Sequence, residues 1–153
     1  MRTFDQWMNE YGVSHKNHTN QMIHKVCVPL IMLSVVGLLW AIPSPDAFSV
    51  VHYLNWATLF VAGVLIFYLT LSFKMFIAMV LQSIFACWIC IKLEEAGILI
   101  PFCVIVFFLS WAAQFYGHKI EGKKPSFLQD LAFLLIGPLW VTRFFYKKIG
   151  INA

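Results

Sequence analysis

The sequence predicts an all-α protein, a polytopic bundle of membrane helices in a single domain over residues 1–153. Three observations favour this fold. Hydrophobic residues make up 61% of the 153 residues and charged residues only 12%, which is far from the balance of a soluble domain. Four apolar runs approach the roughly 20 residues that a helix needs to cross a bilayer. Most of the basic residues lie beside apolar segments, as membrane-flanking charges do.

The first 25 residues are polar and precede the first apolar run. They contain five charged side chains, and they show neither the apolar core nor the cleavage site of a signal peptide. We therefore expect this segment to remain in the mature protein and to form an interfacial helix ahead of the first span.

The apolar runs predict about four transmembrane helices, at residues 26–42, 52–73, 75–91 and 97–116. Pro43 and Pro45 end the first span, because proline lacks a backbone donor and restricts the residue before it. Lys74 alone separates the second span from the third, which predicts a tight helical hairpin. A polar segment, residues 92–97, separates the third span from the fourth.

A fifth apolar segment, residues 127–140, contains Gln129 and Asp130 and is interrupted by Gly137 and Pro138. It predicts either a short fifth span or a re-entrant helix that dips into one leaflet, and we favour the dip. Basic residues on both sides of the segment prefer the cytoplasm, and a full crossing would place one group on the wrong side. These residues are Lys119, Lys123, Lys124, Arg143, Lys147 and Lys148.

Four crossings return the chain to the side of the membrane on which it began. The histidines of residues 15–24, before the first span, and His118, at the end of the fourth, are therefore expected on one face. His52, at the other end of the second span, is expected on the opposite face.

The segment before the first span carries His15, His18 and His24 among Asn17 and Asn20. On a helix, Asn17, Asn20 and His24 share one stripe. His15 and His24 would face opposite sides of one straight helix, so binding of a common metal requires a turn between them, for which Asn17 to Asn20 is suited. A solvated interfacial helix with ordinary histidines explains this segment equally well.

A second polar stripe consists of Gln114, His118 and Glu121, at i, i+4 and i+7 near the end of the fourth span. Such a stripe should face the bundle interior or water rather than lipid. His118 and Glu121 present two potential ligands to one point, as in the iron sites of helix bundles. Alternatively, Gln114 bonds a neighbouring helix and Glu121 pairs with Lys119 or Lys124.

The residue types limit the metal. Imidazoles with at most one carboxylate suit iron, zinc or copper, and the absence of nearby thiolates disfavours a structural zinc site. Di-iron membrane desaturases use more histidines than the five of this chain. A mononuclear site is the better fit.

The two polar segments resemble the fungal 2-hydroxy fatty acid dioxygenase family, endoplasmic-reticulum enzymes of phytosphingosine breakdown with bacterial relatives. The resemblance extends from Tyr11 to about Trp140. Its motifs are H-x-N-x-x-N-x-x-x-H followed by V-P, and Q-F-x-G-H followed by Glu and a basic pair before Pro. The matching residues are His15, Asn17, Asn20, His24, Val28, Pro29, Gln114, Phe115, Gly117, His118, Glu121, Lys123, Lys124 and Pro125.

This resemblance implies an Fe(II)-dependent dioxygenase that shortens a 2-hydroxy fatty acid by one carbon, consuming O2 and releasing CO2. It also implies that His15, His24 and His118 are essential, and we expect them to be the metal ligands. The reaction gives up four electrons, the number that O2 takes up, so no reducing cofactor is required. Accordingly, the sequence shows no dinucleotide-binding or P-loop motif.

Side chains around these histidines are candidates for orienting them. Asn17, Asn20 and Gln114 belong to this group. Glu121 is a further catalytic candidate, and whether Glu121 or His18 binds the metal directly stays open.

The expected partners are a 2-hydroxy fatty acid, O2 and membrane lipid, and nothing indicates nucleic acid. We expect an integral protein of the bacterial inner membrane with the histidines on the cytoplasmic side. The main alternative is a non-enzymatic transporter or scaffold, although the sequence shows neither the internal repeat nor the interrupted spans of transporters. A bis-histidine haem protein is a second alternative, but these histidines lie at span ends rather than at paired depths.

Overall fold

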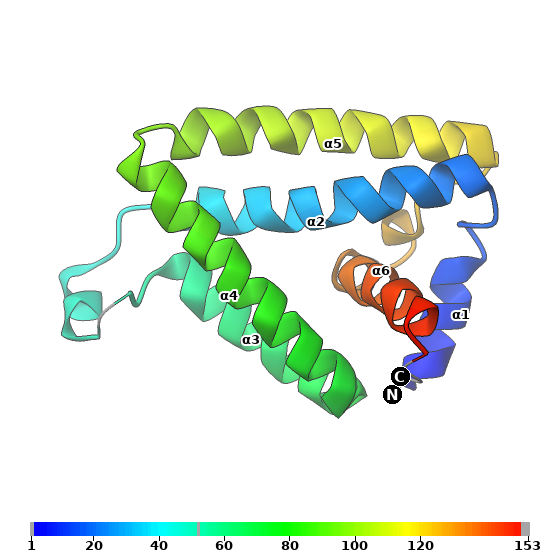
Figure 1. Ribbon diagram of the computed structural model, residues 1–153, viewed down its shortest axis with the longest axis horizontal. Coiled ribbons are helices and arrows are strands. Elements are labelled where there is room, and N and C mark those ends of the chain that lie inside the picture. The colour runs from blue at the N-terminus through cyan, green and yellow to red at the C-terminus, as the bar shows by residue number, and fades with distance from the viewer. Residues whose placement is uncertain (1, 52, 151–153) are drawn as a thin grey trace.

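The computed structural model describes residues 2–51 and 53–150, and this part of the chain folds as a bundle of helices (Figure 1). The predicted all-α class is confirmed. The elements are α1 (Phe4–Gly12), α2 (His18–Trp40), η1 (Asp46–Val50), α3 (Trp56–Leu71), α4 (Phe73–Glu95), α5 (Leu99–Glu121), η2 (Ser126–Leu128) and α6 (Phe133–Lys148).

The long helices α2 and α5 run antiparallel, side by side (Figure 1). A glycine near each end of this pair permits the close approach. A Cβ on Gly117 of α5 would overlap the side-chain oxygen of Asn20 on α2, and a Cβ on Gly37 of α2 would overlap the sulfur of Cys103 on α5. Bulkier residues at these glycines would separate the two helices.

Helices α3 and α4 form a second antiparallel pair, which a single residue connects. Ser72 ends α3 and also caps α4, since its hydroxyl accepts a hydrogen bond of 3.4 Å from the backbone N–H of Met75. The predicted tight hairpin is confirmed. Its turn lies at Ser72 rather than at Lys74, which is part of α4, because a hydroxyl can cap a helix and a lysine cannot.

Three of the described helices, α2, α4 and α5, are long and apolar enough to cross a membrane. The expected second span is shorter than predicted, because α3 begins only at Trp56 and has 16 residues. Asn55 sets this start: its side chain accepts from the N–H of Thr58 at 3.0 Å, and the Thr58 hydroxyl accepts from the N–H of Asn55 at 2.9 Å. His52 lies outside the described residues.

The other helix boundaries follow capping and turn residues. Helix α2 begins at His18 rather than at residue 26, because the Asn17 side chain accepts hydrogen bonds from the first turn. The chain therefore turns at residues 13–17, just before the predicted position. Trp40 ends α2 ahead of the prolines, and Gly97 connects α4 to α5 with φ 69°, as the sequence indicates.

Helix α6 packs against α1, α2 and α4, close to the histidine-bearing start of α2 (Figure 1). The predicted interruption at Gly137 and Pro138 is wrong, since α6 is continuous through both residues. The side-chain amide of Gln82 on α4 donates to the Thr142 hydroxyl at 2.9 Å, and Arg143 pairs with Asp5 of α1 at 2.8 Å. These contacts hold the helix in place, and its dip into one leaflet stays a prediction.

Candidate metal centre

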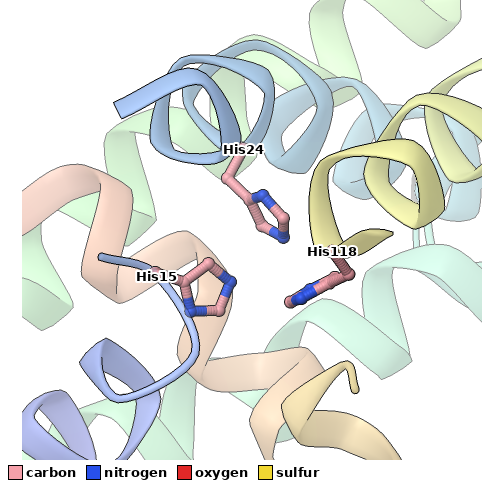
Figure 2. A group of neighbouring side chains, drawn as sticks. All are labelled: His15, His24 and His118. Carbon is pink, nitrogen blue, oxygen red and sulfur yellow. The ribbon is translucent and has the colours of Figure 1, made fainter. Parts of the chain in front are cut away.

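Three histidines from three parts of the chain converge on one point (Figure 2). His15 lies in the turn between α1 and α2, His24 lies near the start of α2, and His118 lies near the end of α5. One ring nitrogen of each lies within 4.8 Å of the other two. The three residues are only 2%, 1% and 5% exposed, so the cluster is buried.

Two of these rings are oriented by backbone carbonyl groups. His15 Nδ1 lies 2.6 Å from the carbonyl oxygen of Tyr11, and His24 Nδ1 lies 2.9 Å from that of Asn20. A carbonyl oxygen only accepts, so each Nδ1 carries the proton and donates. Each Nε2 therefore keeps its lone pair, which is the form in which a histidine binds a metal.

The cluster has unpaired nitrogens that an ion would satisfy. Within the described part of the chain, His15 Nε2 and His118 Nδ1 are buried and have no hydrogen-bond partner. Buried polar atoms in native proteins are nearly always paired, and an unpaired one costs about 1–3 kcal/mol. Three neutral imidazoles are also a common donor set for iron, zinc or copper. The residues thus fit a bound metal ion.

Burial controls the protonation of the cluster member that lies outside the long helices. His15 precedes α2, and burial lowers its pKa to about 4, aided by the nearby His118 and opposed by the hydrogen bond to the Tyr11 carbonyl. Its ring is therefore neutral near pH 7 and available to a cation.

Glu121, the last residue of α5, supports the cluster from outside. Its carboxylate accepts hydrogen bonds from the backbone N–H of Lys16 at 2.9 Å, from that of Asn17 at 2.8 Å and from the Asn20 amide at 3.2 Å. These bonds fix the turn that carries His15. The side chain is directed to this turn, and it is not among the residues grouped around the common point.

A cavity of about 460 Å³ extends from the three histidines into the bundle. Residues of α2, α3, α4, α5 and α6 line it, and most of them are apolar. No lysine, arginine, aspartate or glutamate is among the described residues that form its walls. Its volume is typical of a pocket for a small organic ligand, which usually falls between about 300 and 1,000 Å³.

A family model described as 2-hydroxy-palmitic acid dioxygenase Mpo1-like matches residues 1–149. The chain belongs to this family. The resemblance inferred from the two histidine motifs is thereby confirmed. No curated protein and no solved structure matches the chain.

In this Mpo1-like chain, the structure places the remaining predicted residues around the cluster. Asn17 caps α2, and the Asn20 amide donates to the Ser14 carbonyl oxygen at 3.1 Å. Gln114 is buried on the cavity wall, one helical turn from His118. His18 is exposed and lies outside the cluster.

Two aromatic contacts of the Mpo1-like site were missed in the sequence. The Tyr11 ring stacks on His15 with centroids 4.1 Å apart, and Trp140 of α6 lies 5.4 Å from the same ring. Tyr11 and His15 are four residues apart, and Asn20 and His24 have the same spacing. This spacing is a sequence signal for the contact between Tyr11 and His15. The Trp140 contact depends on tertiary packing alone.

Proposed function

We propose that this protein is an iron-dependent membrane dioxygenase that shortens 2-hydroxy fatty acids by one carbon. The observation that supports this best is a single cavity with two chemically different parts. Three buried histidines within reach of one ion form its polar end, and mostly apolar side chains from five helices form the rest. This arrangement matches an amphiphile with a polar head and an acyl tail, and the family description names such a substrate.

The overall reaction is R–CH(OH)–COOH + O2 → R–COOH + CO2 + H2O. The bond between C1 and C2 breaks, C1 leaves as CO2, and C2 becomes the new carboxyl carbon. The hydroxy acid loses four electrons and O2 gains four. The reaction is therefore balanced without a further reductant.

His15, His24 and His118 would hold the ion. We assign iron rather than zinc, because a dioxygenase needs a metal that exchanges electrons and zinc has no redox chemistry. Bound by these three histidines, Fe(II) would supply the redox chemistry toward O2 that the reaction requires.

The other residues of the chain position these ligands and receive the substrate. The carbonyl groups of Tyr11 and Asn20 keep the rings of His15 and His24 in one tautomer. Gln114, beside His118 on the cavity wall, would orient the carboxyl or hydroxyl group of the substrate. The apolar walls would take the acyl tail and exclude water from the reacting atoms.

We infer that the metal lies on the cytoplasmic side of a bacterial inner membrane. Basic residues surround this end of the bundle: Lys123 donates to the Val13 carbonyl oxygen at 3.2 Å, and Lys25 lies 3.4 Å from the centre of the Phe144 ring on α6. Such residues prefer the cytoplasmic side. From there, a fatty acid in the inner leaflet can enter with its carboxylate near the interface.

The test is a product analysis. The purified protein is loaded with Fe(II) and supplied with 2-hydroxypalmitate and O2, without reductant. We expect pentadecanoic acid, with equal amounts of O2 consumed and CO2 released, and no conversion of palmitate. An iron-loaded preparation that forms no shortened acid would overturn the proposal, and so would an undiminished rate in His118→Ala.

A further inference from the structure

The cavity is elongated along α2 and α5. On α2 its wall extends from His24 to Val36, a separation of twelve residues, which corresponds to about 18 Å at the rise of an α-helix. On α5 the wall extends from His118 back to Phe107, a separation of eleven residues or about 16 Å. Both helices thus place the histidines at one end of the cavity and apolar side chains at the other.

Residues of four helices form the end remote from the histidines. Val36 of α2 belongs to an apolar cluster against which Val61 of α3 packs. Ala86 and Cys103 belong to the same cluster. Ala86 lies one helical turn beyond the lining residue Ser83 on α4, and Cys103 lies one turn beyond the lining residue Phe107 on α5.

This length corresponds to a particular acyl chain. An extended chain advances about 1.25 Å per carbon, by the length and angle of carbon–carbon single bonds. A distance of about 17 Å therefore accommodates roughly 14 carbons beyond the head group, or about 16 in total with C1 and C2 at the metal.

We propose that Val36, Val61, Ser83 and Phe107 form the wall that sets the length of the acyl chain. The inference rests on the proposed function for the orientation of the substrate, with its head at the histidines. A chain that ends at this wall buries all its methylene groups. A longer chain must bend or leave part of itself outside, and a shorter one leaves the far end unfilled.

Two substitutions at this wall should act in opposite directions. Ser83→Phe adds a ring where a small side chain lines the far end, so the preferred chain becomes shorter. Phe107→Ala removes a ring, so the preferred chain becomes longer. A general loss of stability would weaken binding of all chain lengths and would not produce opposite shifts.

The measurement is the affinity of the metal-free protein for saturated 2-hydroxy acids of increasing length, by displacement of a fluorescent fatty acid. We expect Ser83→Phe to weaken the 16-carbon acid at least about tenfold relative to shorter acids, since each buried methylene contributes about fourfold. Val61→Phe should act in the same direction, and it serves if Ser83→Phe does not fold. Ile84→Phe is the matched control, because Ile84 is 62% exposed and does not line the cavity.

Turnover by wild-type protein tests the proposed function separately. If the wild type converts 2-hydroxy acids but the wall variants bind every chain length in the wild-type order, the assignment of the wall is wrong and the proposed function stands. If the wild type converts none of them but the variants shift the binding profile in opposite directions, the wall stands and the proposed function fails.

Discussion

The carboxylate of Glu121 accepts a hydrogen bond of 2.8 Å from the backbone N–H of Asn17. Glu121 ends the helix that carries His118, and Asn17 caps the helix that carries His24 and closes the turn that carries His15. One side chain thus connects all three segments of the candidate metal centre. In our account its role is to hold the turn in place rather than to bind the ion.

We predict that Glu121→Gln weakens metal binding by about 10–100-fold, as is typical when a group that orients a ligand is removed. An amide offers one acceptor oxygen in place of two and would direct its N–H toward a backbone N–H. The measurement is the dissociation constant for Co(II), read from its visible spectrum in competition with a chelator. Glu95→Gln is the control, because Glu95 pairs with Lys92 in the last turn of α4, away from the histidines. Wild-type affinity in Glu121→Gln would refute the positioning role.

The three clustered histidines should differ sharply from the exposed one. We predict that His15→Ala, His24→Ala and His118→Ala each reduce the iron content of the purified protein to background, because each removes a ligand from a set of three. His18→Ala should retain the wild-type content, since His18 is exposed and outside the cluster. Metal analysis of the four variants measures this. Equal iron in all four would show that the metal binds elsewhere.

Gly117→Ala should destabilise the bundle at the metal-binding end. The new Cβ would overlap the Asn20 oxygen, and Asn20 cannot move freely because its amide is bonded to Ser14 and Glu121. We predict a loss of about 1–3 kcal/mol, the usual effect of overpacking a core, visible as a lower Tm in detergent.

Gly63→Ala provides the comparison for this substitution. Gly63 is exposed on α3, and a Cβ there meets nothing within 4 Å. Alanine should leave Tm unchanged or raise it slightly, since glycine is the poorer helix former. A Tm loss as large in Gly63→Ala as in Gly117→Ala would contradict the close contact of α2 and α5.

The metal-free protein should lose stability in acid through His15. Burial lowers the pKa of His15 from the ordinary 6.5 to about 4, so folding favours the neutral ring. Its contribution is fully present above pH 6.5 and is lost as the pH falls toward 4, a decrease on the order of 3 kcal/mol in the free energy of unfolding. Unfolding followed at a series of pH values measures this, and the decrease should be smaller in His15→Asn. The same pH dependence in both proteins would contradict it.

Local patterns in the sequence predicted much of the fold. The apolar runs correspond to helices, and the prolines after Trp40 and the glycine at residue 97 mark connections as expected. The stripe of Gln114, His118 and Glu121 lies on one helix, as its spacing requires. These features depend on neighbours within a few residues, which the sequence shows directly.

Other features depend on capping and tertiary packing. The start of α3 is set by the reciprocal hydrogen bonds of Asn55 and Thr58, which hydropathy does not reveal. Helix α6 passes through Gly137, where a Cβ would lie 3.1 Å from the Tyr11 hydroxyl, so packing against α1 uses the missing side chain. The contact between Trp140 and His15 joins the two ends of the chain, and no local pattern predicts it.

The central claim is that His15, His24 and His118 bind one catalytic iron ion. Iron K-edge X-ray absorption of the Fe(II)-loaded protein, combined with metal analysis, tests it most directly. We predict one iron per chain, bound by three imidazoles and oxygen ligands, with a changed spectrum when a 2-hydroxy fatty acid is added without O2. A spectrum with thiolate ligands, or an unchanged spectrum and iron content in His118→Ala, would contradict the account.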